Sequence, residues 1–139
     1  MRKTTEKCIN ALRSAAAIAS RRHLSMMTIN VSVRDRIIVV GDESHWKLWG
    51  GLIALYNANG LMLSDCHHKT RTTADRLRGL LESFDVHTKS GDKVFYSTAC
   101  GFYVWRERPA KNNCNKTVRF PQTVAESTLI STRDCCFGL

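Results

Sequence analysis

Residues 73–84 have the strict spacing of an amphipathic helix, and the rest of the chain must cover its apolar face. Thr72 or Thr73 is suited to cap this helix, and Asp75 lies in the first turn, where the helix dipole favours an anion. The apolar face consists of Ala74, Leu77, Leu80, Leu81 and Phe84. A chain of 139 residues with 43% hydrophobic residues can supply this cover from one compact domain.

Short segments of strand character surround this helix. Residues 27–33 alternate apolar and polar side chains, and residues 37–40 form a β-branched run. Strands are also expected at 86–88 and 93–97, joined by a turn that contains Gly91. A further strand is expected at 102–105. The pattern predicts an α+β fold, a small single domain with an N-terminal helix and short antiparallel strands.

Two more segments have helical spacing. Residues 4–20 are rich in alanine, and Ile9 and Leu12 lie on one face. In residues 44–58, Trp46, Trp49, Leu52 or Ile53, and Tyr56 recur at intervals of three or four, so a helix is expected there as well. Residues 1–26 are also rich in arginine and serine, which keeps a targeting segment open as an alternative.

The charge of the chain is strongly positive and uneven. The net charge is +9, with +6 on residues 1–36 and +4 on residues 93–139, whereas the middle is close to neutral. Such a field favours an anionic partner, and nucleic acid is the most common one. A stretch of 18 apolar residues is absent from the sequence, so we expect no membrane partner.

Residues 44–97 present a helix, the connection Leu63-Ser64-Asp65, a helix that begins at Thr72-Thr73, and a hairpin with a glycine at its tip. This order resembles a winged helix-turn-helix DNA-binding domain. The resemblance implies a recognition helix at 73–84 and a wing at 86–97 that bind double-stranded DNA and regulate transcription. The nucleic-acid-binding residues that it implies are Arg71, Thr72, Thr73, Arg76, Lys89 and Lys93.

The cysteines and histidines do not have the spacing of a typical metal site or catalytic site. The six cysteines, at positions 8, 66, 100, 114, 135 and 136, are expected to be free thiols in the cytoplasm. Zinc held by Cys66, His67, His68, His87, Cys100 and Cys114 is an alternative with poor spacing. A Cys66–His87 catalytic pair also stays open. We predict no enzyme activity, no catalytic residue, no metal and no cofactor.

The composition changes near residue 109. Residues 1–108 are expected to form the domain, with 44–97 as its winged-helix-like core, and residues 109–139 a basic C-terminal extension that is partly disordered. The alternative function is a small protein-interaction module that inhibits a host enzyme or complex, of the type found in mobile elements. A protein partner and a homodimer are therefore kept beside DNA.

Overall fold

The computed structural model describes residues 2–131, so residues 132–139 of the predicted extension lie outside the described residues. Helix α1 (Lys3–Arg21) is followed by β1 (Met26–Asn30), β2 (Asp35–Val40), β3 (Glu43–Leu48), β4 (Gly51–Asn57) and β5 (Gly60–Leu63). Helix α2 (Arg71–Ser83) comes next, and then β6 (Val86–Thr88), β7 (Phe95–Ser97), β8 (Gly101–Ala110), β9 (Asn113–Thr123), the short 3-10 helix η1 (Glu126–Thr128) and β10 (Leu129–Ser131). The α+β fold class is confirmed.

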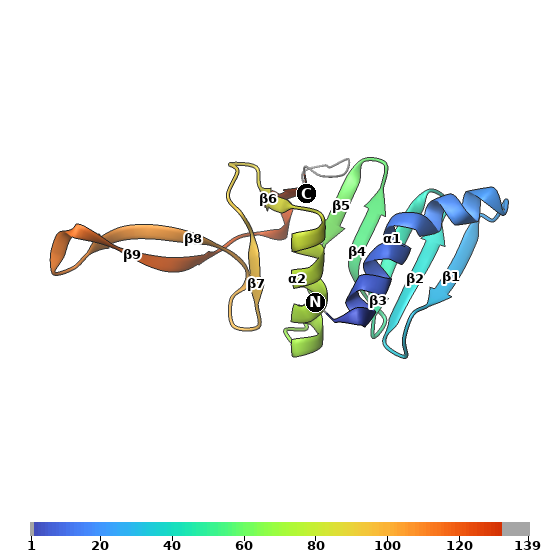
Figure 1. The fold of residues 1–139 in the computed structure, drawn as a ribbon, viewed down its shortest axis with the longest axis horizontal. Helices are drawn as coiled ribbons and strands as arrows, with labels where there is room; N and C mark the ends of the chain where they lie inside the picture. The colour runs from blue at the N-terminus through green and yellow to red at the C-terminus, as the bar shows by residue number, and fades with distance from the viewer. Residues whose placement is uncertain (1, 132–139) are drawn as a thin grey trace.

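Strands β1 to β5 form an antiparallel sheet in which each strand pairs with the next along the chain. Helix α1 packs against β2 and β3, and α2 stands beside the sheet (Figure 1). Side chains of β2 and β3 alternate between the two faces, as the period of a strand requires. Ile37, Val39 and Trp46 point toward α1 and are fully buried there with Leu12 of the helix. The core therefore lies between α1 and this sheet, and it continues around α2 to β6, β7 and β8.

The prediction of a helix at 44–58 is wrong, because these residues form the hairpin β3–β4. Trp49 and Gly50 connect the strands, and both have a positive φ, 53° and 82°. A two-residue turn of this kind matches the twist of a hairpin. Ser44, Trp46 and Leu48 are buried alternately, whereas Trp49 is 68% exposed. The interval between the two tryptophans resembled a helical period, but only one of them belongs to the core.

The helix at 73–84 is confirmed as α2, and its N-cap is Thr70. The Thr73 backbone N–H donates to Thr70 Oγ1 at 3.2 Å. The expected wing is wrong: β6 pairs with β10, and β7 pairs with β8. The two arms of the predicted hairpin are joined by the isolated bridge between His87 and Lys93 and by a hydrogen bond from the Thr88 N–H to the Asp92 carbonyl. Residues 44–97, all of them described, contain α2 as their one helix, so they lack the helical core of a winged helix.

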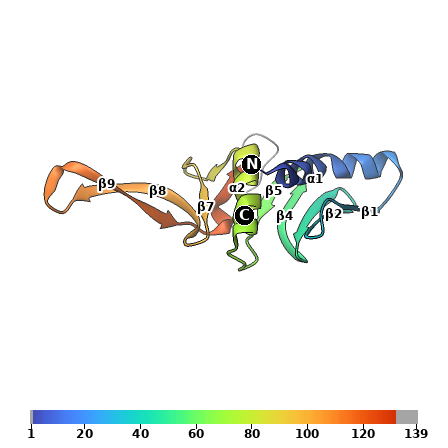
Figure 2. The same ribbon diagram turned by 60° about the horizontal axis from the view of Figure 1, so that its bottom comes forward.

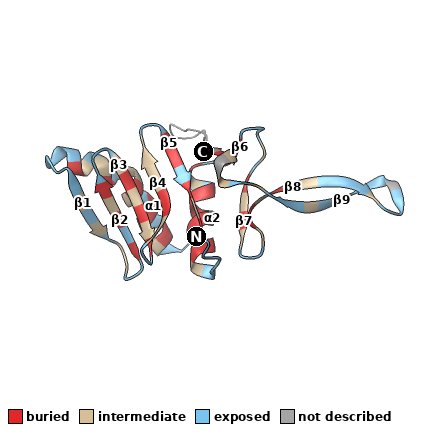
Figure 3. Cartoon of the chain, turned by 180° about the vertical axis from the view of Figure 1, so that it is seen from behind, coloured by how far each residue is buried: buried red, intermediate tan, exposed pale blue. Residues whose placement is uncertain are grey.

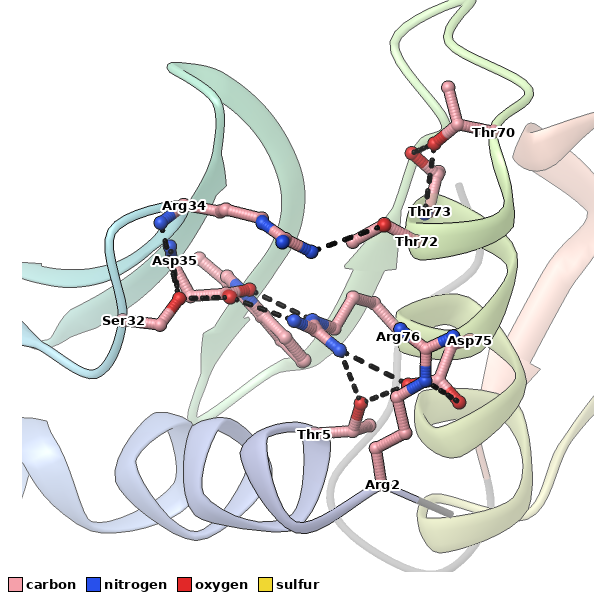
Figure 4. A network of polar contacts seen from close by, with 11 residues as sticks. Arg2, Thr5, Ser32, Arg34, Asp35, Thr70, Thr72, Thr73, Asp75 and Arg76 are labelled. Atoms are coloured by element: carbon pink, nitrogen blue, oxygen red, sulfur yellow. Dashed lines mark hydrogen bonds and ion pairs between the residues drawn. The ribbon is translucent and has the colours of Figure 1, made fainter.

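Arg76 lies at the junction of α1, α2 and the sheet, with 3% of its surface exposed (Figure 4). Its Nε and Nη2 donate to the two carboxylate oxygens of Asp35, each at 3.0 Å. Its Nη1 donates to Thr5 at 2.9 Å and to Asp75 at 3.1 Å. We expected Arg76 to face solvent and contact DNA, and this expectation is wrong. The buried Asp35 carboxylate of β2 pairs with Arg76 and holds this charged side chain in the core.

Burial alone would raise the pKa of Asp35, but hydrogen bonds from Arg76, Ser32 and Trp46 lower it below its ordinary value. The Trp46 indole N–H donates to Asp35 Oδ1 at 3.0 Å. The carboxylate is thus charged and well supplied with donors inside the protein. This network holds both helices to the first strands of the sheet.

Strands β7, β8 and β9 form a second antiparallel sheet on the other side of α2. Strand β7 pairs with β8 as far as Tyr103, and β8 and β9 continue beyond it as a two-stranded hairpin. This hairpin projects far from the body in both views (Figures 1 and 2). Its residues are mostly exposed (Figure 3). The change in composition near residue 109 falls inside β8, since that strand runs to Ala110.

Candidate nucleic-acid interface

The projecting part of the hairpin, residues 105–121, is here called the β-arm. It contains five basic residues and one acid, Glu107. The basic residues are Arg106, Arg108, Lys111, Lys116 and Arg119. Arg106 is partly exposed and the other four are exposed. The β-arm therefore carries a concentrated positive charge, away from the body of the protein.

The register of β8 and β9 divides the β-arm into two faces with different charge. Glu107 lies directly opposite Arg119, so this face is close to neutral. On the other face, Arg106 lies opposite Phe120, and Arg108 lies opposite Val118. We call this second face the arginine face. Its two arginines are two residues apart, so both side chains project to the same side.

Arg106 anchors the base of the arginine face. Its Nη1 lies 2.9 Å from Asp92 Oδ2, and its Nε donates to Gln122 Oε1 at 2.8 Å. Hydrogen bonds from Arg106 and then from Ser90 hold the pKa of Asp92 below its ordinary value. Arg108 makes no ion pair with any residue that the structure describes. Its guanidinium lies 5.2 Å from the centre of the Phe120 ring. Arg108 therefore keeps its charge available.

The neutral face is stiffened by a ladder of rings that begins in β7. Phe95 stacks on Tyr103 at 5.7 Å, and Tyr103 meets Trp105 edge-on at 5.5 Å. Cations close the ladder at both ends: Lys93 lies 5.4 Å from Phe95, and Arg119 lies 4.9 Å from Trp105. Such contacts are individually small but favour one arrangement of the arm. Lys93, expected in a wing, belongs to this ladder.

The other predicted site residues are scattered. Arg71 is exposed at the start of α2, and Lys89 is exposed between β6 and β7. Thr72 is half-buried and accepts from Arg34 at 3.5 Å. Thr73 is 2% exposed and contacts Thr70, so its expected role in base contact is wrong. The structure thus leaves three of the six residues exposed, and it does not gather them on one helix.

Arg71 does share a hollow with two other arginines. Arg2, Arg71 and Arg78 line it together with Thr98 from the β7–β8 connection, and Asp75 is the one acid. Asp75 already accepts from Thr5 and Arg76. Arg78 donates to the Tyr96 carbonyl at 3.0 Å, which fixes its position. This arginine hollow is a second positive surface beside the base of the second sheet.

Arginine side chains of the β-arm were missed by the sequence analysis. Residues 117–123 alternate in the manner of a strand, and their positive charge was counted, but the asparagines near 112–115 favoured an irregular extension. These asparagines lie at the hairpin tip, where β8 and β9 lose their regular register. The alternation in residues 117–123 was the signal that could have identified the second strand of the arm.

The described cysteines Cys8, Cys66 and Cys100 are free thiols. Burial raises the pKa of Cys8 to about 12, so this thiol is inert at neutral pH. The Cys66 thiol donates to the Leu52 carbonyl at 2.8 Å. Within residues 2–131, three or more potential metal-binding side chains do not cluster anywhere. Neither helix in this part of the chain is long and apolar enough to cross a membrane.

The fold and the site define a small protein of mostly antiparallel sheet with a projecting basic arm. Residues 1–118 match the family described as Kyanoviridae Gp96 protein, so the chain belongs to this phage protein family. No curated protein and no solved structure matches it. The resemblance to a winged helix-turn-helix domain is wrong, because the sheets dominate the fold and the matching family is not one of winged-helix domains.

Proposed function

We propose that this protein binds nucleic acid through the arginine face and tip of the β-arm. The observation that carries the proposal is the separation of charge on the arm. Glu107 lies directly opposite Arg119 on one face, whereas Arg108 on the other face has no ion-pair partner among the described residues. Lys111 and Lys116 extend the positive charge to the tip. A projecting positive surface can reach phosphates with little desolvation of the body.

The charges on the body differ in their surroundings. Arg76 is buried with Asp35, and Arg13 lies under α2, where it donates to the Ser83 carbonyl at 2.7 Å. These arginines are committed to the fold. The arginine hollow adds a second surface of positive charge that a long polyanion could reach from the base of the arm.

A charge-matched pair of triple variants tests this proposal. One variant carries Arg108→Gln, Lys111→Gln and Lys116→Gln on the β-arm. The control carries Lys7→Gln, Arg21→Gln and Arg22→Gln, all exposed on or directly after α1. Both variants lose three positive charges, and they differ only in where on the protein the charge is lost. Fluorescence anisotropy with a mixed-sequence duplex is measured at several salt concentrations.

The arm variant should bind on the order of 10–100-fold more weakly, and its salt slope should fall by about 0.9 per lost phosphate contact. The control should lose much less. Equal losses in both variants would mean that net charge, and not the β-arm, attracts the nucleic acid. A wild-type protein that binds no nucleic acid at low salt would contradict the proposed function.

A protein partner remains the second candidate function, and the open face of the five-stranded sheet favours it. This face, opposite α1, carries Ile38, Leu55 and Met62 in one row across the sheet, with His45 of β3 between Ile38 and Leu55. Met62 is 40% exposed, and Val40 nearby is 43% exposed. Exposed apolar rows of this kind often bind protein. Met62→Lys should abolish such an interaction in a pull-down from host lysate while leaving nucleic-acid binding unchanged.

A further inference from the structure

We infer that the nucleic acid is double-stranded B-form DNA, and that the β-arm lies in its major groove. This inference rests on the proposed function and names the substrate class of the same site. Three features of the β-arm carry it: its width, the covered faces of its aromatic rings, and the side chains at its tip.

The width of the β-arm matches the major groove. It consists of two antiparallel strands, whose backbones lie about 4.8 Å apart. The part from Trp105 to Ala110 is roughly 20 Å long at about 3.4 Å per residue. A major groove about 12 Å wide admits a two-stranded ribbon, whereas a minor groove about 6 Å wide does not accept both strands with their side chains. The major groove of A-form RNA is deep and narrow, and side chains cannot read it.

The aromatic rings of the β-arm argue against a single-stranded ligand. Proteins that bind single strands offer aromatic faces on which bases stack. In the β-arm, Arg119 lies over Trp105 at 4.9 Å, and Arg108 lies over Phe120 at 5.2 Å. A base that stacked on either of these ring faces would have to displace a guanidinium. These rings therefore serve to hold the arginines, whose outer edges can contact phosphates and base edges.

The tip of the β-arm has side chains suited to base edges. Asn112, Asn113 and Asn115 are exposed there between Lys111 and Lys116. The Asn115 backbone N–H donates to Asn113 Oδ1 at 3.0 Å, which orders the turn and leaves the amide N–H groups of Asn113 as donors. An asparagine amide pairs with adenine in the major groove, and lysine binds guanine or phosphate. Duplex DNA presents both kinds of partner to an inserted tip.

Competition between nucleic acids of one sequence tests the inference on the full chain. Anisotropy is measured with a 20-base-pair DNA duplex, the RNA duplex of the same sequence, and either DNA strand alone. We expect the DNA duplex to bind at least tenfold more tightly than the other two. If the single strand or the RNA duplex binds as tightly as the DNA duplex, the inference is overturned although the proposed function survives.

The groove is tested with two modified samples of the DNA duplex. In one, bulky groups on C5 of the pyrimidines fill the major groove; in the other, a small ligand occupies the minor groove. The first should weaken binding by at least tenfold, and the second should have little effect. The reverse result would overturn the inference. The double variant Asn112→Ala, Asn115→Ala, which leaves the charge unchanged, should weaken duplex binding several-fold but not the residual binding to the single strand.

Discussion

Arg76 in the body and Arg108 on the β-arm carry the same charge in opposite surroundings. Arg76 is 3% exposed and reaches two carboxylates and a hydroxyl. Arg108 is exposed and lies over a phenylalanine ring. The charge of Arg76 is paired inside the protein, whereas the charge of Arg108 is available to a ligand. The comparison shows that the net positive charge of a sequence overstates the evidence for an anionic partner. Arginines that form ion pairs in the core must first be excluded from the count.

Arg76→Ala should have the largest effect on stability. It leaves Asp35 charged and buried without its main partner, and breaking a buried ion pair in this way costs about 3–5 kcal/mol. We expect the free energy of unfolding in urea to fall by that amount. Nucleic-acid affinity, measured at a temperature where the variant is folded, should stay within twofold of the wild type. A loss of less than 1 kcal/mol would mean that Arg76 does not hold α1, α2 and the sheet together.

Acid should weaken the same ion pair. Because the pKa of Asp35 is lowered in the folded protein, its contribution to stability is fully present above the unfolded value of about 3.9 and is lost as the pH falls toward the lower folded value. The unfolding free energy should therefore decline below about pH 4. The conservative variant Asp35→Asn should be less stable at pH 7 and should show a shallower decline. An identical slope in both proteins would assign the acid sensitivity to other carboxylates.

Elements with a strong local period were predicted correctly from the sequence. Elements that depend on a turn or on pairing between distant strands were not. Helix α2 and the strand at 102–105 have one strong period each, and both are confirmed. The β3–β4 hairpin was missed because Trp46 and Trp49 lie at a helical interval, although the turn places Trp49 in solvent. Pairing between distant strands, such as β6 with β10, leaves no local pattern.

The site was harder to predict than the fold. Arg76 and Arg78 look alike in the sequence, yet Asp35, distant along the chain, draws Arg76 alone into the core. Burial of a charge depends on such distant partners, which spacing does not reveal. The basic charge of residues 93–139 was visible, but the register that separates the two faces of the β-arm became known only from the structure.

Trp105→Ala tests whether the ladder of rings stiffens the β-arm. It removes the ring that Tyr103 and Arg119 contact, at 5.5 Å and 4.9 Å. Because these contacts lie outside the core, the unfolding free energy should fall by only about 1 kcal/mol. Hydrogen exchange of the β8–β9 amides should quicken while the amides of α2 stay protected. Equal exchange in both regions would contradict an arm that is stiffened by its own ladder.

Arg108→Ala should have the smallest effect on stability and a clear effect on binding. The side chain is exposed and has no ion pair with a described residue, so the unfolding free energy should change by less than about 0.5 kcal/mol. Duplex affinity at low salt should fall several-fold, and the salt slope should decrease by about 0.9 if one phosphate contact is lost. Arg108→Lys keeps the charge and should restore most of the salt slope. Because Arg76→Ala is expected to do the opposite, the two variants together separate the arginine that folds the protein from the one that binds its partner. A variant Arg108→Ala that is strongly destabilised, or that binds like the wild type, would contradict the role of the arginine face.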